Sequence, residues 1–327
     1  MFDFELETIS RWISDGGYAS VALQMPEGLK IRAPEISEFI ERETGAVPVI
    51  VGRPCYGACD LFDYHGWADA LIHFGHSPIP SQGDDPNVLY IESRSDAEVD
   101  ESIMGSLSRL PGRIGLLATV QYLGLIPKVK GMLESSGREV RVGEGDLRIC
   151  HPGQVLGCNC SAAESVDADV DGYLFIGEGD FHPLAAAFGM EKPVLVLNPV
   201  TGEVRDMSET RDRILRRRFA AIQGARDAES FLVIVCSKVG QNRSGLADEM
   251  VSLLRRHGRT AHKVIIEEIN PTALMSYQVD AFVNTACPRI AMDDAARYPK
   301  PMLTPPELEI ALGEREWGQY VFDQIRP

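Results

Sequence analysis

The sequence predicts an α/β protein made of three similar small domains, each built on a parallel sheet. Three times, an apolar run typical of a strand leads through a polar turn into an amphipathic stretch that ends in a glycine. Further short apolar runs follow each of these stretches. Strands that alternate with helices form parallel layers, so the repeat predicts three units of one kind.

The first strand and first helix of each unit are the clearest elements. The strands are expected to begin at Val21, Ile114 and Phe231. Apolar residues with the spacing of one helix face then follow at 36–40, 125–133 and 246–254. Each stretch closes with a glycine, which suits the left-handed C-cap of a helix: Gly45, Gly137 and Gly258.

Three further strands are expected in each unit. Second strands are predicted at 47–51, 139–143 and 263–266, and third strands, each after an aspartate, at 69–75, 171–177 and 280–287. Fourth strands are predicted at 88–91, 194–197 and 302–303. The sequence turns polar near 106 and 224, which predicts domains at 1–106, 107–223 and 224–327. Functional loops lie beyond the carboxyl ends of parallel strands, so a pseudo-threefold arrangement is expected to direct three sets of loops to one central site.

The composition excludes some functions. The chain has 327 residues and a formal net charge of −16, which argues against a broad basic surface for nucleic acid. No apolar run approaches the roughly 18–20 residues of a membrane span. The first residues, MFDFELE, lack the basic start and apolar core of a signal peptide. We therefore expect a cytoplasmic protein with no nucleic-acid or membrane partner.

Seven cysteines carry most of the functional information: Cys55, Cys59, Cys150, Cys158, Cys160, Cys236 and Cys287. A reducing compartment disfavours disulfides, so thiols that matter are expected to be metal ligands or redox groups. Each unit has at least one cysteine in a loop at a strand end, with two each in the first and second units and Cys287 in the third. Cys150 and Cys236 are interpreted as buried residues of apolar runs.

The spacing of the loop cysteines leaves several interpretations open. Three thiolates from three units would leave one position open, as in an iron–sulfur cluster with one iron free of protein ligands. Cys55, Cys59, Cys158 and Cys160 are an alternative structural zinc set, although Cys-x-Cys is uncommon for zinc and Cys287 stays unexplained. Buried thiols without a metal are the third alternative. The Cys-x₃-Cys-x₂-Cys loop of conventional radical enzymes is absent, because Asp60-Leu-Phe follows Cys59.

Two weaker signals are also ambiguous. His73 and His76 lie at a strand end and are either ligands or structural residues. The basic run 211–218 is either a solvated helix face or a docking patch for an acidic partner.

Three segments carry a resemblance to a known family. They are Cys-Tyr-Gly-Ala-Cys-Asp at 55–60, Pro-Gly-Gln-Val-Leu-Gly-Cys at 152–158 and Ala-Cys-Pro-Arg-Ile-Ala-Met-Asp-Asp at 286–294. They resemble, in order, the signature segments of the 2-(3-amino-3-carboxypropyl)histidine synthases, the first enzymes of diphthamide biosynthesis. The archaeal single-chain type is most similar, and the resemblance spans nearly the whole chain.

The resemblance implies a [4Fe–4S] cluster held by Cys59, Cys158 and Cys287, with the fourth iron meeting S-adenosylmethionine. Family members cleave that sulfonium at the methionine γ-carbon, and the 3-amino-3-carboxypropyl radical adds to imidazole C2 of one histidine in translation elongation factor 2. The resemblance also implies a homodimer. The reaction requires an electron donor.

No further catalytic residue can be named from the sequence. Strand-end polar groups are candidates for holding the cofactor, and an arginine suits the methionine carboxylate because its fork can bind both oxygens. The candidates are Gln24, Lys238, Gln241, Arg289 and Asp293. The alternative function is that of a non-catalytic α/β protein with a Cys-ligated structural zinc that binds a partner.

Overall fold

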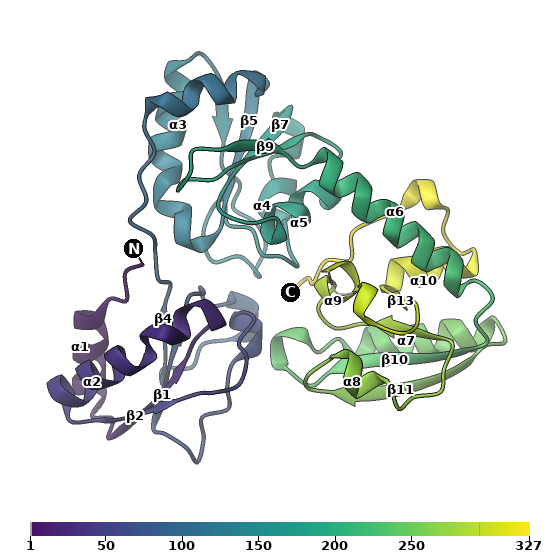
Figure 1. Cartoon of the computed structure of the whole chain (residues 1–327), viewed down its shortest axis with the longest axis horizontal. Coiled ribbons are helices and arrows are strands. Elements are labelled where there is room, and N and C mark those ends of the chain that lie inside the picture. Colours follow the sequence, from purple (N-terminus) through teal and green to yellow (C-terminus); the bar gives the residue numbers. More distant parts are fainter. Residues whose placement is uncertain (1, 294) are drawn as a thin grey trace.

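The computed structural model describes residues 2–293 and 295–327, so Asp294, the last residue of the third motif, lies outside the described part. Figure 1 shows three α/β units arranged as a triangle, with the N-terminal unit in purple, the middle unit in teal and the C-terminal unit in green to yellow. Each unit has its own sheet. The predicted fold class is therefore confirmed.

The first unit contains a four-stranded parallel sheet in the order β2-β1-β3-β4. Its strands are β1 (Ser20–Gln24), β2 (Val47–Ile50), β3 (Ala70–Phe74) and β4 (Val88–Ile91). Its helices are α1 (Leu6–Gly16) and α2 (Ala33–Thr44). The apolar faces of both helices share one hydrophobic core with the strands, through residues such as Ile9 and Ile36. Gly45 adopts φ 71° after α2, as expected of a left-handed helix cap.

The second unit repeats this order and adds one strand, giving β6-β5-β7-β8-β9. The strands are β5 (Arg113–Ala118), β6 (Glu139–Arg141), β7 (Gly172–Ile176), β8 (Val194–Leu197) and β9 (Val204–Asp206). The helices are α3 (Ile126–Ser135), α4 (Ser161–Glu164) and α5 (Phe181–Gly189). β9 is antiparallel to β8 and was not predicted. The reason is local: Asn198 Oδ1 accepts from the Val200 and Thr201 amides, and Gly202 at φ 72° completes a tight reversal.

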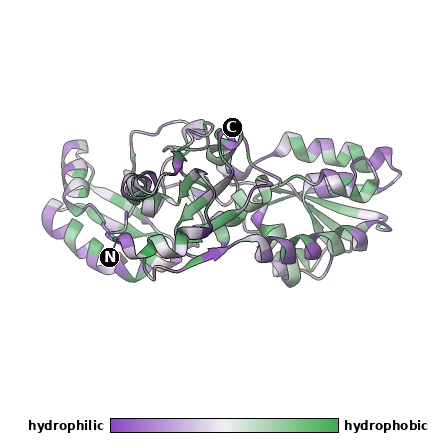
Figure 2. Ribbon diagram, turned by 90° about the horizontal axis from the view of Figure 1, so that it is seen from above, coloured by the Kyte–Doolittle hydropathy of each residue, from purple (hydrophilic) through white to green (hydrophobic). Residues whose placement is uncertain are grey.

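The third unit has the same strand order as the first, β11-β10-β12-β13. Its strands are β10 (Ser230–Cys236), β11 (Thr260–Ile266), β12 (Ala281–Asn284) and β13 (Met302–Leu303). Its helices are α7 (Ser244–Arg256), α8 (Pro271–Leu274), α9 (Arg289–Asp293) and α10 (Pro305–Leu312). The three predicted first helices correspond to α2, α3 and α7, and every predicted strand is present. Figure 2 shows that the strands are mostly hydrophobic and the surrounding helices mixed, as expected of covered sheets.

Helix α6 (Ser208–Ala225) joins the second and third units, as Figure 1 shows. Ile214 packs in the core of the second unit and Ile222 in that of the third. Arg218, the last residue of the predicted basic run, is buried and forms two hydrogen bonds to Glu307 of α10, at 2.8 and 2.5 Å. The C-terminal segment then returns to the second unit, where Phe322 enters the core.

The three sheets fall within the three predicted domain ranges. Val99 and Leu107 pack in the core of the second unit, so the segment before β5 belongs to that packing. The two boundaries at 106 and 224 stay predictions. Among the described residues, no helix combines the length and the apolar character needed to cross a membrane.

Candidate functional site

A cavity of about 760 Å³ lies where the loops of the three units meet. Its size is that of a small-molecule site. Residues from all three units line it, among them one cysteine from each: Cys59, Cys158 and Cys287. Loops from all three units therefore meet at one site, as the repeat predicted.

Each of these cysteines lies in a loop of its own unit. Cys59 lies in a single turn of 3-10 helix, Ala58–Asp60, in the loop after β2. Cys158 precedes α4, and its carbonyl accepts from the Ile325 amide (2.9 Å), which ties the C-terminal segment to this loop. Cys287 follows β12, and its carbonyl accepts from Asn284 Nδ2 at 2.8 Å.

The three thiols are close enough to influence one another electrostatically. Burial, with the neighbouring Cys158 adding to the effect, raises the pKa of the Cys59 thiol to about 12. Burial also raises the pKa of Cys287, with both other cysteines adding to the effect, and that of Cys158. The unliganded thiols are therefore protonated at neutral pH, and their protons must leave when a metal binds.

Nitrogen donors lie close to two of the three sulfurs. Gln241 Nε2 donates to Cys59 Sγ at 3.4 Å, and Arg148 Nη2 lies 4.0 Å from Cys158 Sγ. Four buried guanidinium nitrogens among the described residues have no hydrogen-bond partner, and two of them belong to residues that line the cavity: Arg148 Nε and Arg289 Nη1. Unpaired buried donors are costly, and an anionic group in the cavity would satisfy them. Three thiolates with cationic neighbours therefore fit an iron–sulfur cluster, whose properties depend on hydrogen bonds to sulfur.

Four of the five predicted cofactor-binding residues line the cavity: Lys238, Gln241, Arg289 and Asp293. Gln24 does not, because it is fully buried and its amide is occupied within the first unit. Gln24 Nε2 donates to the Asp60 carbonyl (2.6 Å), and its Oε1 accepts from the Phe62 amide (3.0 Å). Gln24 thus holds the loop that carries Cys59. A cofactor contact stays a prediction for all five residues.

Arg289 and Lys238 are already paired with carboxylates. Arg289 donates through Nε and Nη2 to Asp293, at 2.9 and 2.8 Å, and its guanidinium lies 4.3 Å from the centre of the Phe181 ring. Lys238 Nζ donates to Asp60 Oδ2 at 3.0 Å and to Glu268. Nε and Nη2 of Arg289, which were expected to bind both oxygens of a ligand carboxylate, are therefore occupied by Asp293. Only Nη1 is left for a ligand.

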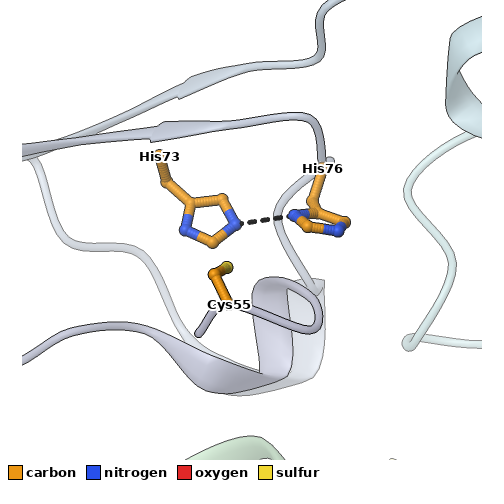
Figure 3. Close-up of side chains that lie close together, drawn as sticks. All are labelled: Cys55, His73 and His76. Carbon is orange, nitrogen blue, oxygen red and sulfur yellow. Dashed lines mark hydrogen bonds between the residues drawn. The ribbon is translucent and has the colours of Figure 1, made fainter. Parts of the chain in front are cut away.

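The remaining thiols lie elsewhere. Cys160 is buried in the core of the second unit, and Cys55 lies beside His73 and His76, as Figure 3 shows. Neither lines the cavity, so the four thiols of the alternative zinc set are not brought together there. Cys236 is buried at the end of β10, as predicted, whereas Cys150 is half-buried in a bend outside any strand.

Arg148 and His182 are among the cavity residues that were not predicted. Arg148 lies in the loop after β6, and His182 lies in the first turn of α5, after β7. Burial lowers the pKa of His182 to about 3, with the positive charge of Arg289 adding to the effect, so its imidazole is neutral. Position after a strand end was the one signal available for both, and many surface residues share it.

Comparison with known proteins agrees with the geometry. The family model of diphthamide synthesis proteins matches residues 25–321. A 2-(3-amino-3-carboxypropyl)histidine synthase from Pyrococcus horikoshii is 39% identical over 315 residues, covering 94% of this chain and 90% of that protein. Subunit 1 of the Gallus gallus enzyme is 31% identical over 329 residues, covering 97% of this chain and 78% of that protein.

A solved structure extends the agreement to the whole fold. The crystal structure of Dph2 from Pyrococcus horikoshii with a 4Fe-4S cluster superposes with a TM-score of 0.90 at 37% identity. The alignment covers 100% of this chain and 95% of that one. The chain therefore belongs to the diphthamide synthesis protein family and is an enzyme of the kind named 2-(3-amino-3-carboxypropyl)histidine synthase.

Proposed function

We propose that this chain transfers the 3-amino-3-carboxypropyl group of S-adenosylmethionine, as a radical, to imidazole C2 of one histidine in translation elongation factor 2. A [4Fe–4S] cluster bound by Cys59, Cys158 and Cys287 is part of the proposal. The observation that carries it is that these three thiols, one from each unit, line a single cavity. The cluster in the related Pyrococcus horikoshii structure supports the assignment.

When bound, such a cluster supplies one electron and an iron without a protein ligand to a sulfonium cofactor. The protein's own contribution begins with charge. Arg148 and Arg289 place positive charge beside the cysteines, each with one buried N–H free of protein partners. We assign Arg289 Nη1 to the carboxylate of the methionine moiety, since Asp293 and the Phe181 ring hold the guanidinium in place.

The walls of the cavity serve a second purpose. Apolar and aromatic side chains, including Leu29, Ile79 and Phe181, form much of its lining. Such a lining excludes bulk solvent together with the oxygen, thiols and reductants dissolved in it, which would otherwise quench a reactive carbon radical before it reached its histidine. The elongation factor and an electron donor are the proposed partners.

Product analysis tests the proposal. Anaerobically reconstituted, dithionite-reduced protein is incubated with S-adenosylmethionine, and the nucleosides are separated by chromatography. We expect 5′-methylthioadenosine and fragments of the aminocarboxypropyl group. With elongation factor 2 present, mass spectrometry should find that group on one histidine.

Two variants sharpen this test. Cys287→Ser should abolish both products, whereas Cys150→Ser, outside the cavity, should retain them. If 5′-deoxyadenosine is the main product, the proposed bond cleavage is wrong even when a cluster is present.

A further inference from the structure

We propose that Cys55, His73 and His76 form a second metal site, for a borderline-soft divalent cation such as Zn²⁺. One ligand atom from each residue lies within 4.8 Å of the other two. Figure 3 shows Cys55 beneath the two imidazoles, which point toward each other. None of its ligands is one of the three cavity cysteines, although His76 also lines the cavity. The site does not depend on the proposed reaction.

The fold brings these ligands together from two strand ends of the first sheet. Cys55 lies in the loop after β2, His73 is in β3, and His76 follows two residues after that strand. β1 lies between β2 and β3 in the sheet, and its last residue, Gln24, is paired in register with His73. His73 is held by the sheet itself, which is a rigid support, and the loops that carry Cys55 and His76 start at the same edge of that sheet.

Gln24 determines which nitrogen of His73 is free. Its amide orientation follows from two backbone contacts, Nε2 donating to the Asp60 carbonyl and Oε1 accepting from the Phe62 amide. Gln24 Oε1 is therefore also the acceptor for His73 Nδ1, at 2.9 Å. A neutral imidazole with a hydrogen on Nδ1 has its lone pair on Nε2, which lies 3.0 Å from His76 Nδ1. Metal-binding histidines are typically held in this way by an acceptor on the other nitrogen.

The two imidazoles are in the form that binds a metal, whereas the thiol must lose its proton, because burial raises the pKa of Cys55 to about 11. Burial lowers the pKa of His76 to about 4 and that of His73 well below its usual value, so both rings are neutral. When the cation binds, the Cys55 S–H bond breaks, a metal–sulfur bond forms and the proton passes to solvent. His76 then binds through Nδ1 and carries its hydrogen on Nε2. No electron is transferred.

The donor set selects the class of ion. Two neutral imidazole nitrogens and one thiolate suit Zn²⁺, which binds three protein ligands when its fourth position stays open to water or a small ligand. Hard cations such as Mg²⁺ prefer oxygen and are disfavoured. Cys55 and Cys59 share one loop, so an ion here would also restrain the loop that presents Cys59 to the cavity.

Metal analysis of the intact protein tests the site. The anaerobically reconstituted full chain is incubated with Zn²⁺ and desalted, and zinc and iron per chain are measured by plasma mass spectrometry. We expect about one zinc per chain in the parent and in the control Cys150→Ser. Cys55→Ser and His76→Gln should each retain at least about tenfold less zinc, with iron unchanged. Equal zinc in Cys55→Ser and the parent, or zinc gained only as iron is lost, would overturn the proposal.

A cobalt titration of the cluster-free full chain gives an independent readout. Co²⁺ bound to a thiolate produces a charge-transfer absorption. This band should be lost in Cys55→Ser and retained in Cys59→Ser. The reverse result would place the ion on the cavity cysteines and refute the site. Circular dichroism shows whether each variant is folded. If Cys55→Ser does not fold, the zinc content of His76→Gln still tests the site.

Discussion

Replacing Gly240 by alanine should weaken cluster binding without removing any ligand. Gly240 lies in the short turn Val239–Gln241 after β10, where the third unit packs against the first. A Cβ at this position would lie 2.5 Å from Cys59 Cα and 2.6 Å from Cys59 Cβ. The missing side chain of Gly240 is thus what allows the two units to bring their loops together.

The size of the effect follows from these distances. Carbon atoms pack at about 3.5–4.0 Å, so the two turns must separate by about 1 Å. Metal ligands tolerate only about 0.2 Å, and the carbonyl of Gly240 would also move away from Arg148 Nη1, now at 3.2 Å. We expect a loss of about 10–100-fold in iron affinity and about 1–3 kcal/mol in stability.

Iron per chain after anaerobic reconstitution, at several iron concentrations, measures the affinity. The matched control is Gly245→Ala in α7, where an added Cβ meets nothing within 4 Å. This control should bind iron as the parent does. If Gly240→Ala also binds iron like the parent, the close approach of the two turns does not matter for the site, and the reasoning is refuted.

Four further predictions concern other parts of the chain. Of the seven single cysteine-to-alanine variants, only those at Cys59, Cys158 and Cys287 should lose iron on reconstitution. Iron loss in Cys55→Ala with retention in Cys59→Ala would reverse our assignment in the first loop. Arg218→Met should lower the free energy of unfolding by about 3–5 kcal/mol in denaturant titrations, because the fully buried Glu307 carboxylate then has no cationic partner. The double variant Arg218→Met/Glu307→Met should recover part of this loss. A hydrogen bond from Arg326 lowers the pKa of Glu164 below its usual 4.5. This pair therefore stabilises the fold above pH 4.5 and loses its effect as the pH falls through the folded-state pKa. The thermal unfolding of Glu164→Gln should depend less on pH in the acid range than that of the parent, and an unchanged pH profile would contradict this. We expect a homodimer by analytical sedimentation at micromolar concentration, and a single 36.0 kDa species would contradict that expectation.

The local pattern of the sequence determined most of the secondary structure. Helix faces and strand runs repeat over a few residues, so the strands beginning at Val21, Ile114 and Phe231 and their helices could be located without tertiary information. The threefold repeat then predicted one loop cysteine per unit at a common centre. The reason is that functional loops lie at the carboxyl edge of each parallel sheet, and a pseudo-threefold arrangement can direct three such edges to one point. The three cysteines that line the cavity follow from that repeat together with the family motifs.

Tertiary structure alone decided which polar side chains are buried and what they contact. Arg218 stands in a basic run that resembles a solvated helix face, yet it is buried against α10, whose Glu307 is 89 residues away in the chain. Gln24, expected at the cofactor, instead supports the Cys59 loop and orients His73. Such outcomes depend on partners distant in sequence, because a buried polar group is stable only where the fold supplies its hydrogen bonds. Periodicity carries no record of those partners, so Arg148 and the Cys55–His73–His76 group became visible only in three dimensions.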